Sequence, residues 1–222
     1  MKLSLKPAVA ALVLASPMVA FGAEFELDPA HTSAQFSVKH MMVSTVRGAF
    51  SKVTGKAVID EKDITKSSVE ATIDAASVDT RVAQRDDHLR SPDFLDVAKY
   101  PTITFKSTKV EQAGEGLKVA GDLTIHGVTK PVVLDLAGLT PETNVWGGIV
   151  RGGVATTKIS RKDFGLTWNK ALEAGGVAVG DEVTITLDFE LKKAQAPAPA
   201  AAAPAKQAPA KQAPAKTAKD TK

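Results

Sequence analysis

The sequence predicts an all-β protein in which eight antiparallel strands close into a barrel, with one short helical insertion. Three observations lead to this prediction: apolar and polar residues alternate in many segments, turn signals separate those segments, and glycines lie inside several of them. The 222-residue chain is 44% hydrophobic and 24% charged, which is typical of a globular protein. It contains no cysteine, which excludes a disulfide scaffold, a thiol nucleophile and a Cys-ligated zinc site.

Alternation with a period of two is clearest in residues 183–191, where Val, Ile, Leu and Phe alternate with Thr, Asp and Glu. In a strand, this pattern places the apolar residues on one face and the polar residues on the other. Such one-sided strands favour antiparallel pairing, with water on one face of the sheet. The same pattern recurs at 34–38, 53–59, 69–75, 103–105, 117–125 and 128–136, and 149–159 is a further candidate rich in Thr, Val and Gly.

Turn signals separate several of these segments. Gly114-Glu115-Gly116 and His126-Gly127 both predict hairpins that connect antiparallel neighbours. Glycines inside strands suit the sharp bends of a sheet that closes on itself. Four glycines have such positions: Gly55, Gly121, Gly152 and Gly153.

Helical signals are concentrated between Thr80 and Tyr100. The polar segment 82–90 comes first, and Ser91-Pro92 then supplies an N-cap and a first-turn proline for a short helix. Pro101 is expected to end that helix. We expect this insertion to cover one end of the barrel, because it alone interrupts the succession of hairpins.

The two ends of the chain differ in composition from the body, residues 23–193. Residues 1–22 carry two lysines, an uncharged apolar run, and small residues at Ala20 and Gly22, which predicts a secretory signal peptide and a periplasmic location. The run is shorter than the roughly 20 residues that a membrane span needs. Residues 194–222 are mostly Ala, Pro, Lys and Gln, which predicts a disordered tail.

The charge is unevenly distributed along the chain. The tail holds five lysines and one aspartate, and the signal segment holds two lysines, so the whole-chain charge of +3 leaves −3 for the body. An acidic body with few aromatic residues argues against a nucleic-acid surface. The basic tail is suited either to transient contact with an anionic envelope surface or to the role of a soluble spacer.

The interior of an eight-stranded barrel either fills with side chains or holds one small ligand. The residues expected to point inward are small or medium-sized and apolar, so a cavity among them would be dry and suited to hydrocarbon. Periodicity alone does not separate this interpretation from a fully packed barrel.

Eight blocks of the sequence, in order, resemble the YceI-like family of exported, lipocalin-like isoprenoid-binding proteins. The resemblance implies an elongated lipocalin-like barrel with a long apolar cavity for a polyisoprenoid or acyl chain. The tail is not part of the family pattern, and Val154 stands where an aromatic residue is expected. The blocks are 31–40, 48–50, 77–80, 85–100, 101–108, 121–134, 161–168 and 179–185.

Candidate site residues are taken from the strand positions expected to face the barrel interior and from the blocks that resemble the family. For an anionic or polar head group the candidates are His31, Arg85, His88 and Arg90. The spacing of the histidines fits no metal motif, and no residue is assigned to catalysis. The expected cavity wall consists of Phe36, Val38, Phe50, Ile73, Ile103, Phe105, Leu123, Ile125, Phe164 and Trp168.

We therefore expect a periplasmic protein that carries or sequesters a long isoprenoid, such as a polyprenyl chain or isoprenoid quinone, or an acyl lipid. No cofactor other than the bound lipid is expected, and a homodimer remains open. One alternative is an enzyme that modifies a lipid head group through Asp86, Asp87 and His88. Another is an envelope interaction module that acts through the basic tail.

Overall fold

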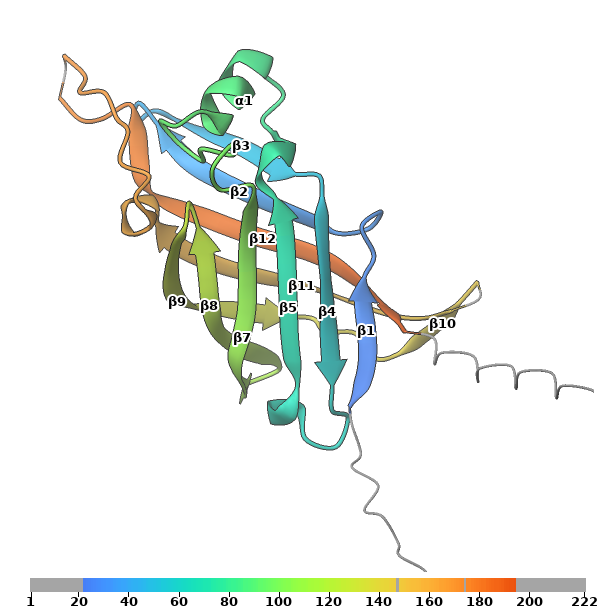
Figure 1. The fold of residues 1–222 in the computed structure, drawn as a ribbon. Coiled ribbons are helices and arrows are strands. Elements are labelled where there is room, and N and C mark those ends of the chain that lie inside the picture. The colour runs from blue at the N-terminus through green and yellow to red at the C-terminus, as the bar shows by residue number, and fades with distance from the viewer. Residues whose placement is uncertain (1–21, 147, 174, 195–222) are drawn as a thin grey trace, which may run out of the picture.

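The computed structural model describes residues 22–146, 148–173 and 175–194. Strands account for most of this region, with one α-helix and three short 3-10 helices (Figure 1). The predicted signal peptide and the predicted tail lie almost entirely outside the described residues. No helix in the described part of the chain is long and apolar enough to cross a membrane.

The strands follow the order of the chain. The α-helix α1 spans Ala83–Arg90, and the 3-10 helices span Ile64–Lys66, Ala75–Ser77 and Arg161–Phe164. The strands are β1 (Ala23–Leu27), β2 (Ser33–His40), β3 (Ser44–Phe50), β4 (Val53–Ile59), β5 (Ser68–Asp74), β6 (Val78–Asp79), β7 (Thr102–Ala113), β8 (Gly116–Ile125), β9 (Val128–Ala137), β10 (Thr143–Val145), β11 (Gly148–Ser160) and β12 (Val179–Lys193).

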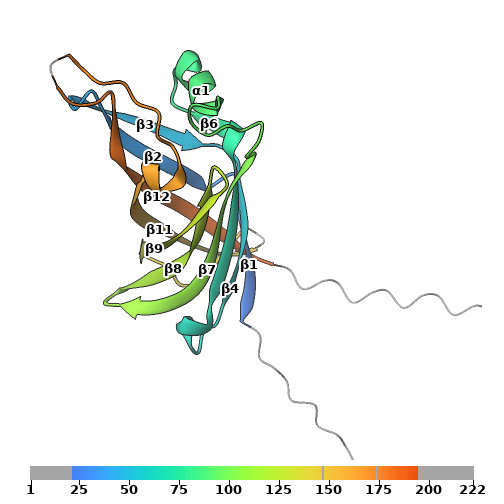
Figure 2. The same cartoon turned by 60° about the vertical axis from the view of Figure 1, so that its left-hand side comes forward.

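A ring of eight antiparallel strands forms the barrel. Its order is β11-β9-β8-β7-β5-β4-β1-β12, and pairing between β12 and β11 closes it. The long strand β12 also pairs with β2, which pairs with β3, and β3 pairs with β6. The end of β12 pairs with β1, and its earlier part pairs with β2. The strands β2, β3 and β6 therefore continue the sheet along β12 past the point where β1 leaves it (Figures 1 and 2). The predicted eight-stranded antiparallel barrel is confirmed.

Both predicted hairpins form. Gly114 lies between β7 and β8 with a φ of 61°, and His126 and Gly127 join β8 to β9 with φ of 52° and 74°. Among the glycines within strands, Gly121 shows why a side chain is excluded. A Cβ at this position would lie 2.5 Å from the ring of Phe105 on the neighbouring strand. Gly121 therefore lets that aromatic ring pack closely against β8.

The helical insertion differs from the prediction in its second half. α1 ends at Arg90, and Ser91 is its C-cap instead of the N-cap of another helix. The chain then folds back on α1, with the Leu95 amide donating to the Leu89 carbonyl and the Asp96 amide donating to the Ser91 carbonyl. This path buries Phe94 and Leu95, so apolar burial outweighs the local helix signal.

Candidate functional site: an apolar cavity inside the barrel

The barrel encloses a cavity of about 290 Å³. Side chains from nearly all the strands line it, and almost no polar atom faces the space. Ligand pockets commonly measure about 300–1,000 Å³, so this cavity lies just below that range. A space with so few polar groups favours hydrocarbon, because a polar group placed there would lose its hydrogen bonds to water.

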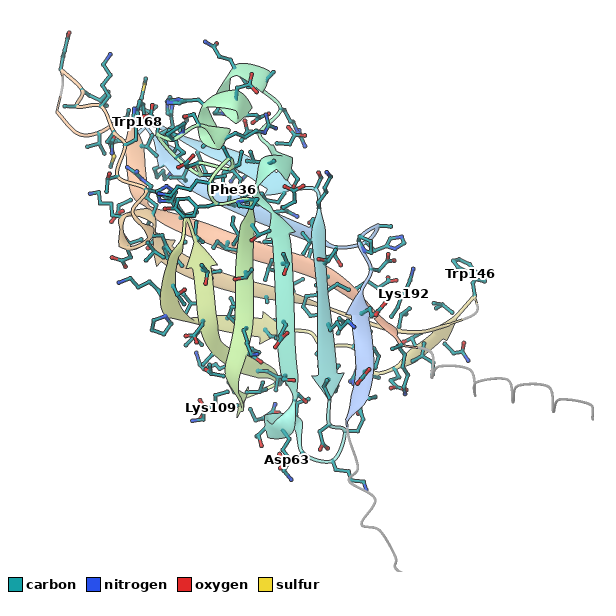
Figure 3. The ribbon with its side chains drawn as sticks, in the orientation of Figure 1. Phe36, Asp63, Lys109, Trp146, Trp168 and Lys192 are labelled. Atoms are coloured by element: carbon teal, nitrogen blue, oxygen red, sulfur yellow. The ribbon has the colours of Figure 1, made fainter. Side chains whose placement is uncertain are left out.

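Eight of the ten expected wall residues line the cavity. They come from β2, β3, β5, β7 and β8, on alternating positions that point inward. These residues are Phe36, Val38, Phe50, Ile73, Ile103, Phe105, Leu123 and Ile125. Figure 3 shows Phe36 near the end of the barrel that α1 covers.

Phe164 and Trp168 lie elsewhere. Phe164 is buried in the 3-10 helix after β11, beside a second, polar hollow between β9 and β11. These two strands pair through only three residue pairs, and the Phe164 ring packs where they separate. Trp168 contacts the His88 ring edge-on at a centroid distance of 4.9 Å and packs on Phe94 at 5.2 Å. Both rings consolidate the fold beside the cavity.

Several wall residues were missing from the expected set although the sequence pattern contained them. Val183, Ile185, Leu187 and Phe189 of β12 line the cavity on the apolar phase of the clearest alternating segment. The same pattern assigns Val154 to the outside, and its side chain is indeed exposed while the neighbouring Ala155 lines the cavity. The departure from an aromatic residue at position 154 therefore leaves the cavity shape unchanged.

Arg161 is a wall residue that opens the block 161–168, although the predicted wall did not include it. Its guanidinium is buried and donates to four backbone carbonyls, those of Leu166, Trp168 and Gly180 and, at 3.3 Å, that of Val179. Burial lowers the pKa of Arg161, although the charge of Asp181 opposes that change. The side chain thereby holds the chain after β11 against the start of β12 at one end of the cavity.

The candidate head-group residues on α1 do not line the cavity. Arg85 donates to the Thr80 hydroxyl at 2.7 Å and to the Thr80 carbonyl at 2.9 Å. Arg90 donates to the carbonyls of Ala76 and Val78, each at 2.8 Å. Among the described residues these arginines fasten α1 to the wall, so their guanidinium groups are already engaged.

The acidic residues of α1 and His88 also fail to converge. Asp86 is buried and accepts from the Thr80 amide at 2.8 Å and from its hydroxyl at 2.5 Å. Asp87 is exposed and pairs with Arg90 at 3.0 Å, whereas His88 pairs with Asp93 at 3.0 Å. Each group has its own structural partner, and the three do not face a shared substrate position.

His31 lies apart from α1, in the connection between β1 and β2. Its Nδ1 is 2.5 Å from the carboxylate of Asp28, and Lys192 Nζ lies 2.8 Å from the same carboxylate. These contacts, from Lys192 first, hold the pKa of Asp28 well below its usual range, and the bond to Asp28 raises the pKa of His31. Glu190 lies 3.8 Å from His31. The cluster ties the β1–β2 connection to β12.

Comparison with known proteins places the chain in a sequence family. A family model described as a YceI-like domain matches residues 25–191. A UPF0312 protein of Vibrio cholerae is 41% identical over 169 residues, which cover 75% of this chain and 89% of the relative. A UPF0312 protein of Serratia proteamaculans is 42% identical over 160 residues, covering 71% and 83%.

Solved structures share the barrel. BcnA of Burkholderia cenocepacia has a TM-score of 0.62 at 26% identity and covers 74% of this chain and 98% of its own. The YCEI protein of Campylobacter jejuni has a TM-score of 0.60 at 30% identity, covering 71% and 90%. A polyisoprenoid binding domain from Saccharophagus degradans has a TM-score of 0.55 at 16% identity, covering 77% and 98%, and shows a likeness of fold.

Proposed function

Because the chain belongs to the YceI-like family, we propose that its barrel binds one long isoprenoid or acyl chain and carries or sequesters it in the periplasm. The observation that supports this most strongly is the cavity, whose wall is almost wholly apolar along the barrel. A structure related in fold is described as a polyisoprenoid binding domain, which agrees with a hydrocarbon ligand. The signal-peptide pattern of residues 1–22 supports the periplasmic location.

Burial of hydrocarbon supplies the affinity in this proposal. Each methylene removed from water contributes about 0.8 kcal/mol, offset by the cost of ordering a flexible chain. Since almost no polar atom faces the cavity, a polar head group would remain outside the apolar space and contribute little to binding within it. The ligand class is therefore defined by its chain, and a polyprenyl chain, an isoprenoid quinone tail or a fatty acyl chain all satisfy it.

Binding, with no further cofactor, explains the arrangement better than head-group chemistry. Asp86, Asp87 and His88 are each engaged by a separate partner, so a general acid and base would first need to be released from those contacts. On this proposal His88→Ala leaves the lipid content of the purified protein unchanged.

Native mass spectrometry of protein purified from the periplasm tests the proposal. We expect a discrete mass above that of the polypeptide, and denaturation should release one hydrocarbon-rich species. A mass equal to that of the bare polypeptide, unchanged after incubation with isoprenoid quinones and fatty amides, would contradict it.

A further inference from the structure

The turn between β2 and β3 exposes three consecutive apolar side chains. The exposed fractions are 47% for Met41, 62% for Met42 and 86% for Val43. A run of exposed apolar residues at a hairpin tip is unfavourable in water unless something else covers it. The turn therefore requires an explanation beyond the connection of two strands.

The backbone of this turn makes the choice of residues more unusual. Met41 and Met42 have φ of 50° and 60°, and the Val43 amide donates to the His40 carbonyl at 3.1 Å. Positive φ at both central positions is the geometry of a type I′ turn, for which Asn-Gly is strongly preferred. Methionine at both positions costs conformational energy, and such costs cluster at functional sites.

A second loop adds to the same apolar surface. The Met41 amide donates to the Ala178 carbonyl at 2.8 Å, and a Cβ at Gly176 would lie 3.3 Å from Met42 Cγ. The exposed Val177 lies between Gly176 and Ala178 in the sequence. We call Met41, Met42, Val43 and Val177 the apolar tip. Both views of the ribbon place the β2–β3 turn beside the chain that leads into β12 (Figures 1 and 2).

The apolar tip lies at one end of the cavity and among positive charges. Val38 and Val179, on the strand ends that lead to the tip, both line the cavity. Lys39, Arg47 and Lys170 are exposed around these strands and loops, and within the described residues none of them forms an ion pair. Glu173 is an exposed acidic residue on the loop that carries Lys170 and leads into β12.

We propose that the apolar tip inserts into the interfacial region of a phospholipid bilayer, with these three cations on anionic head groups. Flexible methionine side chains on a convex turn suit a fluid lipid surface, and basic residues beside an apolar wedge are typical of interfacial anchors. The end of the barrel that carries the apolar tip would then face the bilayer, and the cavity reaches this end at Val38 and Val179. The inference depends on the tip itself and not on which lipid the cavity holds.

A redesigned turn tests this without disturbing the fold. The triple variant Met41→Asn, Met42→Gly, Val43→Thr removes the apolar side chains and gives the turn its preferred residues, so its melting temperature should not fall. Binding of the mature chain, residues 23–222, is measured by flotation with vesicles of equal parts phosphatidylethanolamine and phosphatidylglycerol, at about 0.15 M and about 0.5 M salt. We expect the wild type to float with the vesicles at both salt concentrations. The floated fraction of the variant should be lower by about tenfold or more.

Trp146 provides the matched control. It follows β10 on a different hairpin, its side chain is 106% exposed, and Figure 3 shows it far from Trp168, on the side of the barrel where Lys192 lies near the end of β12. Trp146→Ser should leave flotation unchanged. Equal flotation of the triple variant and the wild type would overturn the proposal, as would loss of binding only in Trp146→Ser. Wild-type binding that vanishes at about 0.5 M salt would also overturn it, because screened charges and not insertion would then account for the contact.

Discussion

At the scale of single residues, the pair Val154 and Ala155 distinguishes an open cavity from a packed core. Adjacent residues in a strand face opposite sides, and here Val154 is exposed while Ala155 lines the cavity. We expect Ala155→Phe to place a ring in the space that a lipid chain would occupy and to lower the lipid content several-fold. Lipid extraction and mass spectrometry measure that content, and Val154→Phe is the control that should leave it unchanged.

The stability of the same variant decides between the two interpretations. Adding a large side chain to a fully packed core typically costs about 1–3 kcal/mol. If the space at Ala155 is open, the free energy of unfolding of lipid-free Ala155→Phe should equal or exceed that of the wild type. A loss of about 1–3 kcal/mol in urea unfolding, with the lipid content unchanged, would favour a packed interior instead.

The Asp28–His31 pair makes a pH-dependent contribution to stability. The raised pKa of His31 means that its contribution is complete below its ordinary value of 6.5 and is lost as pH rises through the folded value. The lowered pKa of Asp28 means that its contribution is complete above 3.8 and is lost as pH falls through the folded value. The cluster should therefore stabilise the fold most between those two ordinary values.

Urea unfolding of His31→Gln at several pH values tests this. The wild type should exceed the variant in unfolding midpoint by the largest margin at about pH 5, and the margin should shrink toward about pH 8. His40→Gln is the control, since His40 forms no ion pair within the described residues. A margin that stays constant over this range would contradict the assignment.

At the scale of elements, two neighbouring aspartates of α1 have different structural roles. Asp86 is 6% exposed and accepts two hydrogen bonds from Thr80 of the chain after β6, whereas Asp87 is exposed and pairs with Arg90. Loss of a buried acceptor leaves its donors unsatisfied at a cost of about 1–3 kcal/mol, while an exposed pair contributes about 0–1 kcal/mol. We expect Asp86→Ala to lose the larger amount and Asp87→Ala little, measured by urea unfolding. Equal losses would show that the Thr80 contacts do not anchor α1.

Elements were predictable where the signal is local. The alternation in β8 and β12 assigns each residue to a face, and the His126-Gly127 turn requires positive φ at adjacent positions, so these parts follow from the sequence. The path of Ser91 to Tyr100 does not, because burial of Phe94 and Leu95 depends on the barrel end beneath them.

The same limit applies to parts of the candidate site. Arg161 donates hydrogen bonds to carbonyls as far along the chain as that of Gly180. A local sequence pattern does not predict a contact between such distant segments. The wall residues on β12 carried a clear signal in their alternation, yet the predicted set did not include them. Phe164 lies on the expected apolar phase but follows the end of β11, in a 3-10 helix, and packs in the core without lining the cavity.

At the scale of the whole molecule, the barrel and the two ends of the chain carry opposite charge. Residues 23–193 have a net charge of −3, while residues 194–222 add five lysines and one aspartate. Electrostatic attraction to anionic vesicles should therefore come mainly from the tail and should weaken steeply with salt. Insertion of the apolar tip depends on apolar burial and should persist when salt is raised.

Deletion of residues 194–222 separates these contributions. At about 0.05 M salt the deletion should reduce flotation with phosphatidylglycerol-containing vesicles several-fold, and at about 0.5 M salt the truncated and full chains should float alike. The lipid content should be the same in both, because the cavity is built from residues before Lys192. A truncated protein that loses its lipid, or that fails to float even at about 0.5 M salt while the full chain still does, would show that the tail takes part in lipid binding or in insertion.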